Sequence, residues 1–262
     1  MFKGEIFTSG LLRAARDMSR GAAEHVLDFL LPPRCLVCQG LVEATGAMCG
    51  QCWTDMRFIS PPVCERLGTP LSHDIGTGGV SARAIADPPV FDRARAVAAY
   101  DDIARRLVLS LKFSNRRDLA GPMGRWMAAS GAEFLKLDTI VVPVPLHRSR
   151  LIGRRFNQSA ELAHVVAAQW GSAAEPMLLE RSRRTRQQVG LDAKSRHKNV
   201  RGAFRVRKGF EHFVHGRPVV LVDDVLTTGS TVSACARVLQ KAGASGVDVL
   251  CFAVAAPEGD MP

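Results

Sequence analysis

Residues 218–222 read Pro-Val-Val-Leu-Val, a short run of apolar and β-branched side chains without a charge. Such a run is typical of a central strand in a parallel sheet, because helices cover both faces of that sheet. Two adjacent acids, Asp223 and Asp224, follow the run directly. Ligands bind at the carboxyl ends of strands in open α/β sheets, so we expect these acids at a binding crevice.

The rest of the chain from Phe91 onward alternates between strand and helix patterns. We expect further strands near residues 94–100, 139–144 and 247–254, and helices near 103–112, 119–134, 158–170 and 230–242. Strands that alternate with amphipathic helices predict an α/β fold, with a mainly parallel central sheet flanked by helices. We assign residues 91–262 to this domain.

The first 33 residues have a different pattern. Apolar side chains recur at helical spacing between residues 11 and 30, and Pro32 and Pro33 end the pattern. We favour an amphipathic helix that packs on the protein, with contact to a membrane surface as the alternative. No signal-peptide order and no membrane-spanning run is found, so we expect a cytoplasmic protein whose thiols stay reduced unless a metal binds them.

Residues 34–90 are rich in Cys, Gly and Pro and hold two Cys-x2-Cys turns. Two residues between thiolates let one tight turn direct both sulfurs at a single ion, and two such turns complete a tetrahedral zinc site. A site with four thiolates has no open position, so its Zn²⁺ would be structural. The predicted ligands are Cys35, Cys38, Cys49 and Cys52.

Hydroxyl side chains surround a glycine directly after the acid pair. Thr227, Thr228, Ser230 and Thr231 flank Gly229 at the start of the expected helix. Hydroxyl donors, inward-turned backbone amides and a helix N-terminus together bind a monophosphate, while two carboxylates accept hydrogen bonds from ribose hydroxyls. The segment is neither a Walker A loop nor a dinucleotide fingerprint, and it favours a phosphorylated sugar.

The run from Val219 to Thr231 resembles the phosphoribosyl diphosphate motif of type I phosphoribosyltransferases. More narrowly, the chain resembles the ComF family, bacterial proteins with an N-terminal zinc ribbon and a C-terminal phosphoribosyltransferase domain that are associated with competence for DNA uptake. The matching segments extend over nearly all of the chain from Cys35 to Val254. Besides the loop they are residues 143–148, 154–158, 181–187 and 196–204.

The resemblance implies a ligand, a metal and roles for residues. Mg²⁺ and the diphosphate would be held by a loop containing Pro143, Val144, Pro145, His147 and Arg148. The 5-phosphate would be held by Val225, Leu226, Thr227, Thr228, Gly229, Ser230 and Thr231. Asp223 and Asp224 would hold the ribose, and Arg181, Arg184 and Lys194 would steady the leaving diphosphate, which makes these five the implied catalytic residues.

The chain departs from the family pattern in two respects. A second pair of Cys-x2-Cys turns would need four cysteines, and this chain has one of them, Cys64, with Leu67, Ser81 and Ala84 at the other three positions. A second zinc site is therefore expected to be lost. Arg155 stands where the family often has glycine before the aromatic-Asn-Gln segment, which leaves no basis for a close approach of that backbone to a ligand.

Charge leaves three functions open. The chain carries a net +10, and residues 181–208 hold eleven Lys or Arg against the single acid Asp192. A flexible basic loop of this kind suits either a diphosphate or a DNA backbone. We therefore favour a protein that binds phosphoribosyl diphosphate and assists DNA uptake together with single-stranded DNA and processing proteins, with a salvage or biosynthetic phosphoribosyltransferase or a ligand-sensing regulator as alternatives.

Overall fold

The computed structural model describes residues 32–114, 116–146, 156–182 and 202–255. The chain forms two compact units, residues 1–53 and 54–262, and each is considered by itself. The predicted domain boundaries at residues 33 and 90 stay predictions, and the expected amphipathic helix lies outside the described residues. Within the described residues, no helix has the length and apolar character needed to cross a membrane.

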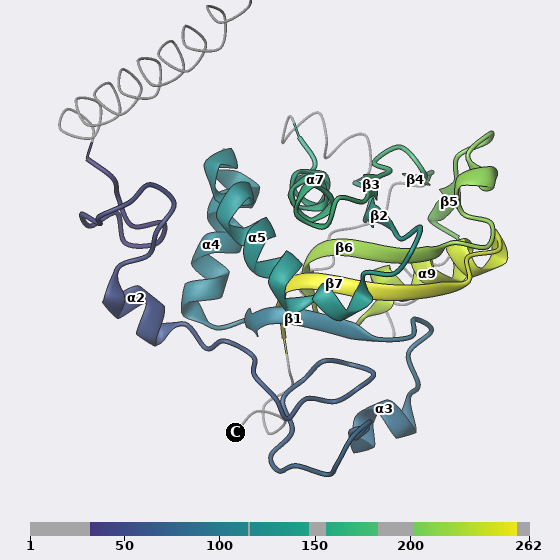
Figure 1. Cartoon of the computed structure of the whole chain (residues 1–262), viewed down its shortest axis with the longest axis horizontal. Helices are drawn as coiled ribbons and strands as arrows, with labels where there is room; N and C mark the ends of the chain where they lie inside the picture. The colour runs from purple at the N-terminus through teal and green to yellow at the C-terminus, as the bar shows by residue number, and fades with distance from the viewer. Residues whose placement is uncertain (1–31, 115, 147–155, 183–201, 256–262) are drawn as a thin grey trace, which may run out of the picture. The chain divides into compact units, whose positions relative to one another are not determined.

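A parallel sheet of five strands forms the centre of the second unit, which confirms the predicted mainly parallel sheet and adds one strand to the four expected. Its order is β1-β7-β6-β2-β3, and Figure 1 shows β1, β7 and β6 side by side. Every neighbouring pair in this sheet is parallel. The strands are β1 (Ala94–Ala99), β2 (Ile140–Pro143), β3 (Ala173–Ala174), β6 (Pro218–Leu226) and β7 (Gly246–Val254).

Helices connect the strands close to where the sequence predicts them. The helix α7 spans Gln158–Trp170, begins at the N-cap Asn157 and ends at Gly171, which is left-handed with φ 64°. The other long helices are α4 (Asp102–Phe113), α5 (Ala120–Ser130) and α9 (Ser230–Lys241), and single 3₁₀ turns lie at Arg117–Leu119, Ala132–Phe134 and Glu211–Phe213. The sequence pattern therefore located the helices because their apolar positions recur with helical period.

The sheet has a topological switch point between β2 and β6. From β2 the chain passes through α7 to β3 at one edge, whereas from β6 it passes through α9 to β7 in the opposite direction. The carboxyl end of β2 lies beside the residue that precedes the two acids of β6, since Pro143 pairs with Val222. A crevice at such a point is where open α/β sheets bind ligands.

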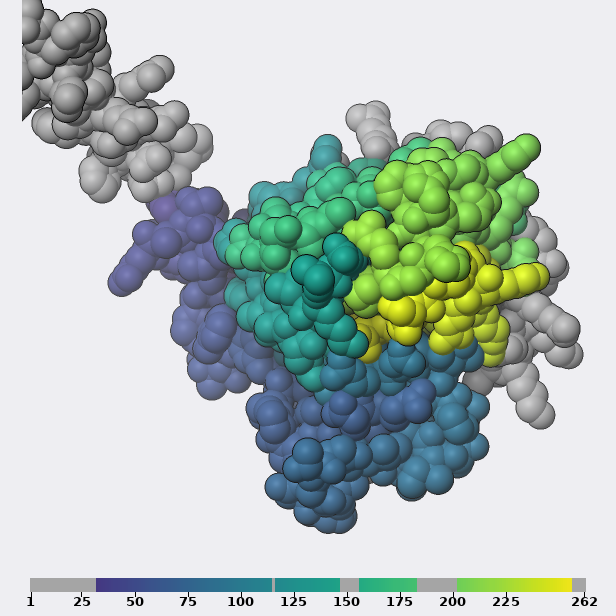
Figure 2. All heavy atoms as spheres, turned by 45° about the vertical axis from the view of Figure 1, so that its right-hand side comes forward, coloured from purple at the N-terminus to yellow at the C-terminus, as the bar shows by residue number. Residues whose placement is uncertain are grey.

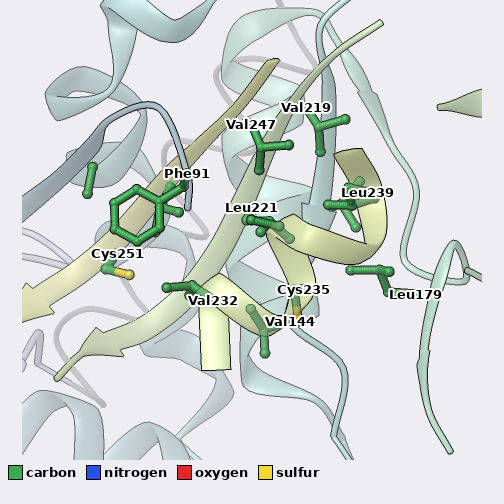
Figure 3. Packing of buried hydrophobic residues seen from close by; sticks show 14 of the residues in the cluster. Phe91, Val144, Leu179, Val219, Leu221, Val232, Cys235, Leu239, Val247 and Cys251 are labelled. Carbon is green, nitrogen blue, oxygen red and sulfur yellow. The ribbon is translucent and has the colours of Figure 1, made fainter. Parts of the chain in front are cut away.

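The helix α9 covers one face of the sheet. Val232, Cys235 and Leu239 of α9 pack with Val219 and Leu221 of β6 (Figure 3). This apolar cluster contains no residue of α5 or α7, although α5 contacts β1 and β7 and α7 contacts β2 and β6. The helices α5 and α7 therefore cover the opposite face, and the sheet is buried on both sides, as its uninterrupted apolar strands predict.

The strand β6 is longer than predicted. It continues four residues past Val222, to Leu226, because β7 keeps pairing with it up to the Leu226–Val254 pair. Pairing with β2 ends at Val222, apart from a hydrogen bond from Val144 N to Val222 O of 2.9 Å. The two acids are thus part of a strand whose β2 side is open.

Two short strands flank the basic segment. β4 (Leu179–Arg181) and β5 (Phe204–Val206) form an antiparallel pair, and residues 183–201 between them lie outside the described residues. The helix α9 contacts β5. In the space-filling view, the green surface of the residues around β5 adjoins the yellow surface of the chain's last elements (Figure 2).

Candidate functional site

Four sulfurs meet in the first unit. The Sγ atoms of Cys35, Cys38, Cys49 and Cys52 all lie within 4.8 Å of one another. Backbone N–H groups of Val37 and Cys49 donate to Cys35 Sγ at 3.4 and 3.3 Å. Burial works to raise the pKa of Cys35, but these hydrogen bonds from Cys49 and Val37, with one from Cys38, lower it to about 6. The four sulfurs within 4.8 Å of one another fit a structural Zn²⁺ site.

Residues 63–86 repeat this backbone pattern with only one of the four cysteines, Cys64. Cys35 N donates to Gly40 O, and Cys64 N likewise donates to Thr69 O, at 2.7 and 2.8 Å. Ser81 N donates to Cys64 Sγ at 3.2 Å, as Cys49 N does to Cys35 Sγ. Ser81 also caps the short helix α3 (Ala82–Ala86) by accepting a bond from Ala84 N. A knuckle-like shape here is held by hydrogen bonds and burial.

Asp224 is a buried carboxylate whose two oxygens are both occupied. Lys112 Nζ, from α4, lies 2.7 Å from Asp224 Oδ1, and the side chains of Lys112 and Asp224 are 20% and 6% exposed. Gln158 Nε2, from α7, donates to Asp224 Oδ2 at 2.8 Å. Because successive strand residues face opposite sides, Asp224 points towards the face covered by α7. Its negative charge is compensated inside the protein.

Asp223 is half-buried and keeps one oxygen open. Its Oδ1 accepts hydrogen bonds from Ser159 Oγ at 2.9 Å and from Asp224 N at 3.0 Å. Among the described residues, nothing donates to its Oδ2. Burial and the charge of Asp224 raise the pKa of Asp223 to about 7, although Lys112, Asp224 N and Ser159 act in the opposite direction. An open carboxylate oxygen can accept a ligand hydroxyl or bind a cation.

The segment Phe156–Ser159 organises this end of the sheet. Asn157 Oδ1 accepts a bond from Ser159 N at 3.2 Å, which caps α7, and Asn157 Nδ2 donates to Val144 O at 3.2 Å. One side chain thus ties the loop after β2 to the start of α7, and the next two residues contact the acids. Arg155 lies outside the described residues.

Residues 227–231, which we call the glycine-hydroxyl loop, lead into α9. Gly229 is the N-cap, with φ 73°, and no side chain caps the helix. The first N–H groups of a helix have no partner within it, so the loop offers backbone donors. Thr228 Oγ1 and Ser230 Oγ are hydrogen-bonded to each other at 2.9 Å. Val225 and Leu226, which precede the loop, belong to β6.

The candidate diphosphate residues are described only in part. Pro143 ends β2, and Val144 and Pro145 are buried next to it, whereas His147 and Arg148 lie outside the described residues. Arg181 is buried in β4, with its guanidinium carbon 5.2 Å from the ring centre of Phe204. Arg184 and Lys194 lie outside the described residues.

Sequence reasoning missed two members of the cluster around the acids. Lys112 had no signal, because it is one basic residue at the end of an amphipathic helix, more than 100 positions before Asp224. Ser159 follows the Asn157-Gln158 pair directly, and an N-cap followed by hydroxyl and amide side chains could have indicated it. Gln158 was part of the segment that carries the family resemblance.

The chain is similar to curated proteins along most of its length. DNA utilization protein YhgH of Escherichia coli (strain K12) is 34% identical over 232 residues, which cover 85% of this chain and 97% of the relative. Competence protein F of Haemophilus influenzae is 28% identical over 222 residues, which cover 82% and 94%. A solved structure of the allosteric regulatory enzyme of purine biosynthesis covers 55% of this chain and 30% of its own, at 20% identity and a TM-score of 0.37, a likeness below the level that supports a conclusion.

A model of the double zinc ribbon domain matches residues 26–84, a range that includes both the four cysteines and the knuckle around Cys64. The parallel sheet, with its acid pair and glycine-hydroxyl loop at the switch point, follows that range. The chain therefore belongs to the ComF family, and in it a zinc-ribbon region precedes a domain with a parallel central sheet.

Proposed function

We propose that this protein binds phosphoribosyl diphosphate with Mg²⁺ at the switch point of the sheet and that it takes part in the uptake or use of DNA. The observation that carries the proposal is the open Asp223 Oδ2. Asp223 lies near the carboxyl end of β6, and the glycine-hydroxyl loop, residues 227–231, follows that strand at the start of α9. A ribose phosphate needs a carboxylate acceptor and a set of phosphate donors at this kind of spacing.

The two acids have different roles in this proposal. Asp223 accepts a ribose hydroxyl, because its Oδ2 has no donor among the described residues. Asp224 positions Asp223, since Lys112 and Gln158 already occupy its oxygens. The backbone donors and hydroxyls of residues 227–231 hold the 5-phosphate. The contacts to the diphosphate are assigned to Arg181, Arg184 and Lys194, as the family resemblance implies.

Mg²⁺ fits the same place. Magnesium prefers carboxylate, phosphate and water oxygens, and it usually binds through one or two carboxylates together with substrate phosphates. Asp223 offers such an oxygen, and Pro143, Val144, Pro145, His147 and Arg148 form the loop assigned to the diphosphate. When bound, Mg²⁺ would neutralise charge on the diphosphate.

The DNA role is supported by the relatives' names and by charge. The relatives are called DNA utilization protein and competence protein F. The chain's net charge of +10 is concentrated in residues 181–208. We propose that this basic surface binds single-stranded DNA mainly through phosphates, so the apparent affinity should fall steeply between low and physiological salt. An affinity that stays constant over this range would contradict that part.

The ligand assignment is tested by calorimetry with phosphoribosyl diphosphate and Mg²⁺. Asp223→Asn should weaken binding at least about tenfold, because a hydrogen bond between a hydroxyl and a carboxylate is lost. Asp102→Asn is the matched control, since Asp102 is an exposed acid at the start of α4. Equal affinity of wild type and Asp223→Asn would refute the assignment.

Catalysis is tested by incubating the protein with phosphoribosyl diphosphate, Mg²⁺ and a panel of bases and amines. Release of diphosphate with one acceptor identifies a phosphoribosyltransferase. Tight binding without release identifies a ligand-sensing or DNA-processing role for the same site.

A further inference from the structure

A cavity of about 300 Å³ lies beside the glycine-hydroxyl loop in the second unit. Its walls come from the loop and first turns of α9, from α3, from the segment 87–91 and from the paired ends of β6 and β7, Leu226 and Val254. Its size is at the lower end of the range for small-molecule pockets. The cavity is therefore large enough for a ligand of its own.

The cavity is distinct from the ribose site. Neither Asp223 nor Asp224 lines it, and no residue from 143 to 146 does. The strand β7 pairs with β6 on the side opposite to β2. The cavity lies at the Leu226–Val254 pair, on the β7 side of β6, whereas residues 143–146 lie on its β2 side. A molecule here would approach the loop from the side that the acid pair does not occupy.

Two arginines in its wall are without partners. Arg83 in α3 and Arg237 in α9 both line the cavity, and among the described residues neither guanidinium has an ion pair or a hydrogen bond. Arginine side chains bind phosphate through several N–H donors in a planar arrangement. The hydroxyl of Ser233 in α9 adds a donor to the same wall. This set of groups attracts an anion.

The remaining walls suit a ring rather than a bare ion. Pro88, Pro89 and Val90 are apolar and at least partly exposed, and they also line the cavity. Asp87 is the one acid in the lining, and it can accept a hydrogen bond from an amino group of a base. Inorganic phosphate would leave these apolar walls without a contact.

From this combination we propose that the cavity is a second ligand site, which binds a nucleotide with its phosphate at Arg83 and Arg237 and its base against Pro88, Pro89 and Val90. The shared chemistry is one nucleotide unit, and either a free nucleotide or the end of a single DNA strand can supply it. The proposal goes beyond phosphoribosyl diphosphate binding and does not depend on Asp223.

The test compares two double variants of the full-length protein by calorimetry. The probes are deoxyadenosine monophosphate and a 5′-phosphorylated deoxyadenosine dinucleotide, each measured at one low salt concentration. Arg83→Ala with Arg237→Ala should weaken binding of the nucleotide probe about tenfold or more, because two charged donors are removed. The matched control is Arg105→Ala with Arg125→Ala, which removes the same charge from exposed positions of α4 and α5 that do not line the cavity.

The outcomes separate this site from the proposed ribose site. The proposal predicts that Asp223→Asn leaves nucleotide binding unchanged, and that the Arg83 and Arg237 double variant keeps its affinity for phosphoribosyl diphosphate within about threefold. Binding of the monophosphate alone identifies a free nucleotide, and tighter binding of the dinucleotide identifies a strand end. The proposal is overturned if neither probe binds the wild type, or if both double variants bind equally well.

Discussion

The unfolding free energy of Asp223→Asn minus that of wild type, both without ligand, should increase from acidic to alkaline pH. The pKa of Asp223 is about 7 against an ordinary 3.8. Between these values the folded protein holds a proton that the unfolded chain releases, so wild-type stability falls as the pH rises and levels off above about pH 7. Asparagine does not titrate, and its oxygen can still accept the bonds from Ser159 and Asp224 N.

The size of the effect follows from the same pKa. From pH 5 to pH 7 the stability of wild type falls by at most about 3 kcal/mol, at 1.36 kcal/mol per pH unit. Since Asp223 is half-buried, solvent screening reduces this to about 1.5 kcal/mol. The stability difference between Asp223→Asn and wild type should grow by that amount over this range.

The assay is urea unfolding of both proteins at pH 5, 6, 7 and 8, followed by far-UV circular dichroism. The difference between variant and wild type is the measured quantity, because other titrating groups and the zinc site contribute equally to both. Asp102→Asn serves again as the control, with a difference that should not change with pH. A pH-independent difference for Asp223→Asn, or one that shrinks above pH 6, would refute the reasoning.

Three further predictions concern the stability of the protein and its zinc content. Lys112→Met should destabilise the protein by about 3 kcal/mol, because it leaves Asp224 as a buried unpaired charge, and adding Asp224→Asn should recover part of the loss in urea unfolding. Elemental analysis should find one zinc per chain, and two would contradict the loss of the second site. Gly124→Ala should cost about 1–3 kcal/mol of unfolding free energy, because its Cβ would lie 2.6 Å from Val165 Cβ between α5 and α7, whereas Ala129→Ser on the exposed side of α5 should cost less than about 0.5 kcal/mol.

The different roles of the two acids change one expectation from the sequence. Adjacent acids at a strand end suggested an equal pair that holds the ribose together. In the structure Asp224 is paired with Lys112 in the interior. Its removal would leave a largely buried ammonium without a partner, so only variants of Asp223 test binding without also testing stability.

Periodic features were predictable because they are local. The helix predicted at residues 158–170 has those bounds, since its cap Asn157 and its terminal Gly171 are both visible in the sequence. The short strands β3, β4 and β5 were not predicted, because two or three residues carry no periodic signal. The end of β6 was placed four residues early, because its continuation depends on pairing with β7 and not on its own polar residues.

The sequence by itself determined the class of fold, the four-cysteine cluster and the glycine-hydroxyl loop, because each depends on residue types at short spacing along one segment. Only the tertiary structure decided which acid is open. Lys112 reaches Asp224 from α4 and Ser159 reaches Asp223 from α7, contacts that join positions 112 and 64 residues apart. Only the tertiary structure, too, set Arg83 and Arg237 around one cavity, since its walls include the carboxyl ends of two neighbouring strands and two helices from distant parts of the chain. Such contacts arise from packing against a common sheet, and no local pattern encodes them.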